Sequence, residues 1–272
     1  RPAANLCRRL SRTIESPSLM GVLPGIGHVM AGIGGFVAPA VNFSGTNVYL
    51  TRDAGLTSAV DSKLLLGSFW LNPSVDAVDD EILSAATTLA GSTLRVDIFK
   101  STNDNIRINV RNAAGTLILN VNSSTDTIEA ADGWVHVLFS FDLADVAKRF
   151  LYINDTSDLV VTTYTNDTMD FTNADWAIGA DPAAGFDWTG DMAEIYFAPA
   201  QYLDLSVEAN RRKFRSPAGK PVDLGVDGSR PTGTAPLVYL HNSLVTWQTN
   251  LGTGGGFTEN GALTSAATSP SD

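Results

Sequence analysis

The stretch Trp134-Val-His-Val-Leu-Phe-Ser-Phe141 decides the fold of this 272-residue chain. Two later runs, Phe150-Leu-Tyr-Ile-Asn-Asp155 and Gly190-Asp-Met-Ala-Glu-Ile-Tyr-Phe197, also alternate in side-chain character and are bounded by Gly, Asn or Asp. Alternation with a period of two is what an antiparallel sheet requires when one face packs on a core and the other meets water. The three runs therefore predict antiparallel β-strands.

The same period extends along most of the chain. In residues 106–111, Ile106, Ile108 and Val110 face one way and the polar residues between them face the other. Asn112-Ala-Ala-Gly115 and Asn154-Asp155 supply the turn chemistry of hairpins. We predict strands at 41–43, 48–51, 64–71, 82–87, 94–99, 106–111, 116–121, 134–141, 149–154, 159–165, 174–179 and 190–198. Many short strands with closely spaced turns indicate an all-β sandwich or barrel.

The C-terminal part is less regular. One helix is predicted at 206–215, with Ser206 as its N-cap and basic residues in its last turns. Residues 237–240 and 245–247 are predicted strands. The tail from Thr249 is rich in Gly, Ser and Thr, but Phe257 and Leu263 can hold it against the sandwich as an edge strand.

Residues 1–40 differ from the rest. Residues 2–14 have the spacing of a short basic amphipathic helix, and residues 16–51 contain no charged residue. The density of Gly and Pro in the apolar part argues against a membrane-spanning helix. We expect an extended arm that buries its apolar surface against other subunits. The alternative, in which this segment wraps its own sandwich, stays open. The predicted division is thus an arm at 1–40 and a sandwich with a C-terminal extension at 41–272.

Charge excludes one class of partner. The net charge is −11, and residues 41–204 hold eight Lys or Arg against 23 Asp or Glu. Nucleic-acid binding needs a positive surface, so no nucleic acid is expected as a partner. The chain has one cysteine, Cys7, so no intrachain disulfide can form.

The motifs of the middle region resemble a known superfamily. The order Trp-x-His-Val, then Leu-Tyr-Ile-Asn-Asp, then Gly-Asp-Met-Ala-Glu-Ile-Tyr is similar to that of laminin-G-like domains of the concanavalin A-like lectin/glucanase superfamily. The opening Val41-Asn-Phe-Ser-Gly-Thr-Asn-Val-Tyr-Leu50 looks like the first strand of such domains. The resemblance implies a jelly-roll β-sandwich with one short helix.

Some relatives in that superfamily are glycoside hydrolases, which resemble one another in a Glu-x-Asp-x-x-Glu motif that is missing here. The nearest candidate pair, Asp191 and Glu194, has an odd spacing that predicts opposite strand faces, and Glu194 is expected to pair with an arginine. The three histidines are far apart in sequence, and no nucleophile elbow occurs. We therefore expect no catalytic residues; a polysaccharide hydrolase is the weaker alternative.

Related domains often carry calcium at the sandwich rim, which is what the resemblance implies here. Two acidic segments could supply oxygen ligands: Asp76, Asp79, Asp80 and Glu81, or Asp181, Asp187 and Asp191. Neither has the ligand register of an EF-hand loop. Calcium is thus left open, and no metal site is assigned.

Sugar binding is the other theme of the family. Carbohydrate sites place an aromatic face against the apolar face of a sugar, with acidic or amide acceptors for the hydroxyls. Trp188 lies in a predicted loop, so we expect it to be an exposed platform, with Asp187 as the hydroxyl acceptor. His136 is expected to be a half-buried structural residue.

A more specific resemblance covers roughly residues 41–270. Tyr202-Leu-Asp-Leu-Ser206, Asn210-Arg-Arg-Lys-Phe214 and Ala218-Gly-Lys-Pro-Val-Asp-Leu-Gly225 are similar to sandwich proteins encoded by phages and prophages. It implies a virion structural protein, such as a head fibre, decoration or tail-associated protein. This chain would then be an oligomer in the virion, joined to other virion proteins through residues 1–40 and able to bind host-surface glycans. The alternative is a secreted or cell-surface bacterial carbohydrate-binding module.

Overall fold

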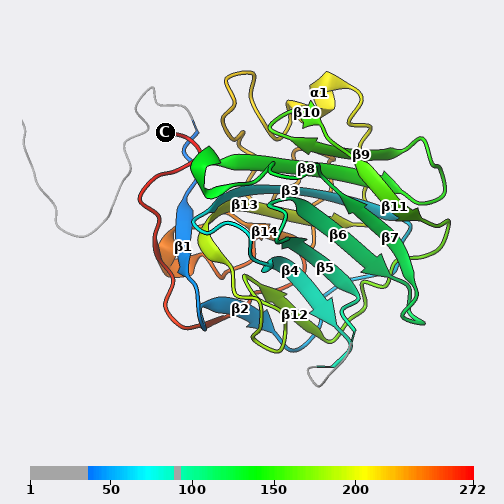
Figure 1. Ribbon diagram of the computed structural model, residues 1–272, viewed down its shortest axis with the longest axis horizontal. Helices are drawn as coiled ribbons and strands as arrows, with labels where there is room; N and C mark the ends of the chain where they lie inside the picture. Colours follow the sequence, from blue (N-terminus) through cyan, green and yellow to red (C-terminus); the bar gives the residue numbers. More distant parts are fainter. Residues whose placement is uncertain (1–35, 89–92) are drawn as a thin grey trace, which may run out of the picture. The chain divides into compact units, whose positions relative to one another are not determined.

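The computed structural model describes residues 36–88 and 93–272, which form two antiparallel sheets (Figure 1). Sheet A has the order β10-β9-β8-β3-β13-β1-β16. The C-terminal half of β13 pairs with β14, and its N-terminal half pairs with β1. Its strands are β1 (Ala40–Ser44), β3 (Leu64–Pro73), β8 (Val135–Asp142), β9 (Arg149–Ile153), β10 (Thr156–Ser157), β13 (Thr189–Pro199), β14 (Val238–Leu240) and β16 (Thr264–Ser265).

Sheet B has the order β11-β7-β6-β5-β4-β12-β2-β15. Its strands are β2 (Tyr49–Arg52), β4 (Asp80–Ala86), β5 (Val96–Lys100), β6 (Ile106–Arg111), β7 (Leu117–Asn122), β11 (Val160–Tyr164), β12 (Asp175–Ile178) and β15 (Thr258–Asn260). All twelve strands predicted between residues 41 and 198 are present, each within two residues at both ends. The chain therefore has the expected β-sandwich.

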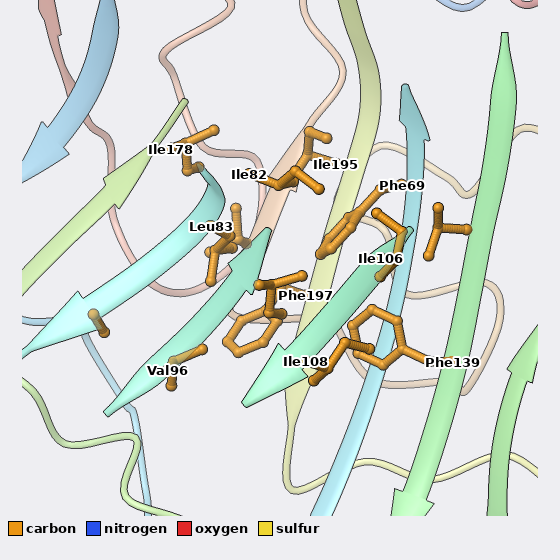
Figure 2. Close-up of a cluster of buried hydrophobic side chains, with 14 of the residues drawn as sticks. Phe69, Ile82, Leu83, Val96, Ile106, Ile108, Phe139, Ile178, Ile195 and Phe197 are labelled. Carbon is orange, nitrogen blue, oxygen red and sulfur yellow. The ribbon is translucent and has the colours of Figure 1, made fainter. Parts of the chain in front are cut away.

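The core lies between the two sheets. Figure 2 shows Phe69, Phe139 and Phe197 of sheet A facing Ile106 and Ile108 of sheet B. Phe69 and Phe139 meet edge to face with 5.5 Å between ring centroids, which is a favoured aromatic geometry. The strict alternation of residues 106–111 is confirmed, because its three aliphatic side chains are all buried.

The outer face of sheet A is covered as well. A second cluster of buried side chains fills it: Leu66, Leu138, Tyr152, Tyr196, Ala198, Leu205, Phe214, Leu224 and Tyr239. Phe214 and its neighbours come from the segment that contains α1 (Glu208–Arg211). Arg211 and Arg212 bind the Asp155 carboxylate at 2.6 and 2.7 Å and thereby fasten this segment to the β9–β10 turn. Sheet A is thus packed on both faces, so the outer face of sheet B is left as the broad polar sheet face of the described residues.

The C-terminal part departs from the predictions in two places. The helix predicted at 206–215 is reduced to 208–211, because Ser206 bonds Asp204 rather than capping the helix and the following residues form turns. Residues 244–246 form a 3-10 helix, η2 (Leu244–Thr246), so the strand predicted at 245–247 is wrong. A second 3-10 helix, η1 (Ala130–Asp132), precedes β8. The tail does form edge strands, β15 on β2 and β16 on β1.

The basic helix at 2–14 and almost all of the arm at 1–40 lie outside the described residues, so those predictions stay untested. Within residues 36–88 and 93–272, no helix has the length and apolar character that crossing a bilayer requires.

Candidate functional site

A transverse row of polar side chains crosses the outer face of sheet B. Directly opposed residues of neighbouring strands share a face, and the strand register aligns Ser84, Asp97, Asn109, Asn120 and Thr163 on β4, β5, β6, β7 and β11. We call this set the polar row. The Asn109 amide donates to Asp97 Oδ2 at 3.0 Å, while Asn109 Oδ1 is buried without a partner. The row therefore retains an open acceptor.

A hollow of about 210 Å³ adjoins the polar row at β4 and β5. Six residues line it, and we call it the Phe186 hollow: Asp79, Glu81, Leu94, Asp97, Phe99 and Phe186. Phe186 comes from the loop before β13 and is 58% exposed, in contrast to the buried aromatic residues of the core. Its carbonyl accepts the Glu81 N–H at 2.8 Å, which holds the loop against β4.

The loop that presents Phe186 has an ordered backbone. Asp181 accepts the N–H groups of Ala183 and Gly185 at 2.9 and 2.7 Å. Phe186 itself has φ of 56°, a left-handed conformation that is uncommon for a bulky side chain. Such a conformation persists when the surrounding contacts determine it. Here the aromatic side chain is therefore held outward at a fixed place.

Glu81 and Asp97 form a carboxyl pair at the floor of the hollow. Glu81 is 5% exposed, and burial raises the pKa of its carboxyl well above the ordinary value, with further increases from Asp97, Asp181 and Asp79. Burial also raises the pKa of Asp97, which the hydrogen bonds from Asn109 and Glu81 partly oppose. Glu81 therefore keeps its proton and donates a hydrogen bond to the Asp97 carboxylate. Its other oxygen, Oε2, is buried without a hydrogen-bond partner.

The structure corrects the sequence-based choice of aromatic platform. Trp188 was expected to be exposed, but its side chain is 0% exposed and belongs to the core between the sheets. Its indole therefore cannot stack on a sugar in this conformation. Asp187 accepts the Asn47 N–H at 3.1 Å, and its Oδ1 is buried without a partner. Its role as an acceptor for a ligand stays a prediction.

The two acidic segments do not gather into metal sites. Asp76 accepts the Ala130 N–H, and Asp79 accepts the Thr102 N–H. Asp191 accepts the side-chain amides of two asparagines, Asn42 and Asn72.

The described residues contain one group of three carboxylates close enough for an ion: Asp104, Asp126 and Glu129. In this group Lys100 Nζ already lies 2.8 Å from the Asp104 carboxylate. This lysine competes with an ion for Asp104. Calcium binding by this chain stays a prediction.

The candidate acid pair on β13 also differs from its prediction. A bulge between Ala193 and Tyr196 changes the alternation of the strand. Met192 and Ile195 both enter the core, so Asp191 and Glu194 both lie on the outer side and not on opposite faces.

Glu194 bonds Tyr239 and His241 instead of an arginine. His136 is structural, as expected, but it is fully buried rather than half-buried; it bonds Ser68 at 2.9 Å and stacks on Trp70.

Comparisons with known proteins agree with this architecture. Residues 67–199 match the family model of the concanavalin A-like lectin/glucanase superfamily. The heptameric SAP-like pentraxin from Limulus polyphemus is similar with a TM-score of 0.51 and 13% identity, over 85% of this chain and 96% of that one.

A candidate carbohydrate-binding protein from Bacteroides ovatus is similar with a TM-score of 0.55 and 13% identity, over 86% of this chain and 62% of that one. No curated protein sequence matches the chain. At this identity the structural likeness shows the fold alone, which is a concanavalin A-like jelly-roll sandwich.

Proposed function

We propose that this chain is a non-enzymatic, lectin-like protein that binds glycans on the outer face of sheet B. The observation that carries the proposal is Phe186, an exposed phenyl ring that borders a hollow lined in part by Glu81, a residue with an unsatisfied carboxyl oxygen. A sugar ring presents an apolar face to an aromatic ring and hydroxyl groups to acceptors at its edge. The Phe186 hollow offers both.

The polar row extends this surface beyond one sugar unit. Asn109 Oδ1 provides a further free acceptor, and Arg107 Nε, on the same face of β6, provides a buried donor without a partner. Buried polar groups of this kind gain a hydrogen bond when a ligand supplies one. The surface is therefore suited to an oligosaccharide that lies across several strands.

The carboxyl pair argues against hydrolysis. Glycosidases separate their two carboxyl groups by about 5 to 9.5 Å so that substrate or water fits between them. Glu81 and Asp97 instead bond each other directly. This geometry supports binding without turnover at the Phe186 hollow, and reducing-sugar release from a bound polysaccharide would contradict the proposal.

A glycan array comparing the unchanged protein with Phe186→Ala tests the proposal. We expect the variant to lose about tenfold or more in affinity, because it loses the stacking surface, without a change in melting temperature. Val226→Ala is the matched control, since Val226 is also an exposed apolar side chain but does not line the hollow and follows Leu224, which packs on the outer face of sheet A. Glycan binding that is equal in all three proteins would contradict the proposal, as would an array with no bound glycan.

We further propose that the protein works as a virion component, attached through residues 1–40. The resemblance of residues 202–225 to phage-encoded sandwich proteins and the uncharged segment at 16–51 support this setting. Repetition around a particle would add avidity to a weak site. Deleting residues 1–40 should leave a folded sandwich that no longer enters particles; normal incorporation of the truncated protein would contradict attachment through this segment. Absence of the full chain from particles would instead favour the secreted or cell-surface carbohydrate-binding module.

A further inference from the structure

The charges of the Phe186 hollow restrict the glycans that suit it. Three of its six lining residues, Asp79, Glu81 and Asp97, are acids, and none of the described residues that line it is a lysine or arginine. A carboxylated sugar entering this hollow would meet acidic residues and no cation among the residues that line it. A sugar with a positive charge would meet acceptors on the floor and aromatic carbon at the wall.

One acceptor of the residues that line the hollow has no hydrogen-bond donor, and a ligand could supply it. Glu81 is more than nine-tenths buried, lines the hollow and leaves Oε2 without a partner. A buried acceptor left unpaired costs about 1–3 kcal/mol. An ammonium group offers three N–H donors, and it can therefore serve Glu81 and Asp97 together.

The wall suits the same group. Phe186 and Phe99 both line the hollow, and a cation within about 6 Å of an aromatic centroid is attracted by the electrons of the ring face. Carboxylates below and phenyl rings beside the site are a combination that favours a small cation.

We infer that the Phe186 hollow accepts the protonated amino group of an amino sugar, with Glu81 and Asp97 accepting its N–H groups and Phe186 covering the charge. This inference rests on the proposed glycan-binding function and names the ligand class of the same site.

Binding of the cation has a proton balance. In the free protein Glu81 holds a proton that it shares with Asp97; the ligand's ammonium replaces that proton, which leaves to solvent, while the ammonium keeps its own. The charged groups that act on the pair are Asp79 and Asp181 near Glu81, and Arg111 near Asp97. Affinity should therefore rise with pH until the amine itself loses its charge.

Isothermal titration calorimetry tests this with a glucosamine oligosaccharide and its fully N-acetylated counterpart of equal length. We expect the amine form to bind the unchanged protein about tenfold more tightly. Titration in two buffers of different ionisation enthalpy should show release of about one proton per site. Glu81→Gln, which keeps the shape of the side chain, should abolish both the preference and the proton release.

Asp53→Asn is the control for general attraction of a cation to an acidic protein, because Asp53 is exposed and does not line the hollow. An equal loss in Asp53→Asn and Glu81→Gln would overturn the inference. Equal affinity for both oligosaccharides, lost in Phe186→Ala, would overturn the inference and leave the proposed function standing. Absence of binding to either oligosaccharide and to every glycan of the array would overturn both.

Discussion

His136 illustrates how the sandwich sets the protonation of a single side chain. Its ring is 1% exposed, stacks on Trp70 and forms a hydrogen bond with Ser68. Burial and, to a smaller extent, the charge of Arg215 lower the pKa of His136 to about 3. In the unfolded chain a histidine takes up a proton near pH 6.5. Between about pH 6.5 and 3 the unfolded state therefore binds more protons than the folded state.

The free energy of unfolding contributed by His136 should consequently fall as the pH falls through this window, by at most about 1.4 kcal/mol per pH unit. Urea unfolding of the unchanged protein and of His136→Gln across pH 7 to 4 measures it. The difference in the free energy of unfolding, unchanged protein minus His136→Gln, should decrease as the pH falls from 7 to 4. Glu81 has a raised pKa and acts with the opposite sign, so the difference between the two proteins isolates His136; parallel profiles would contradict the prediction.

At the scale of the element, strand β3 contains a position without room for a side chain. A Cβ on Gly67 would lie 2.2 Å from the Phe139 ring on the neighbouring strand β8. The ring is buried between the sheets, so it cannot move freely into solvent. Gly67 is therefore required by packing and not by its backbone conformation.

We expect Gly67→Ala to lower the free energy of unfolding by about 1–3 kcal/mol, the usual effect of overpacking a core. Gly256→Ala is the control, because the nearest atom to its Cβ lies 3.7 Å away; it should change the stability by less than about 0.5 kcal/mol. Equal chemical-denaturation midpoints for the two variants would contradict this account.

The strands were predictable because their signal is local, whereas the candidate site depends on contacts that a linear pattern does not contain. The exposure predicted for Trp188 was wrong: of the two aromatic residues in the loop before β13, Trp188 enters the core and Phe186 is exposed. Which one enters the core depends on the left-handed backbone of Phe186 and on the bond between its carbonyl and Glu81. The bulge after Ala193 likewise changes a face assignment without a sign in the residue spacing.

For the whole molecule, the C-terminal tail closes both sheets. β15 covers the edge of sheet B at β2, and β16 covers the edge of sheet A at β1. An uncovered edge strand presents unpaired N–H and C=O groups to other chains. The tail therefore protects two edges with few residues.

Deleting residues 257–272 should uncover both edges and produce concentration-dependent self-association, measurable by light scattering after size-exclusion chromatography. The double variant Phe257→Ala, Leu263→Ala is the control, because it removes buried side chains of the tail but keeps its backbone pairing. It should lose stability and associate less. A truncated protein that has the same number of subunits per particle as the control at all concentrations would contradict the prediction.

The position of β1 between β13 and β16 has a consequence for synthesis. Asn42 and its partner Asp191 are separated by 149 residues of chain. Translation proceeds at about 5–20 residues per second, so the first strand leaves the ribosome on the order of ten seconds before its partner exists. During that interval nascent β1 has no strand with which to pair. Both of its partners, β13 and β16, are made later in the chain.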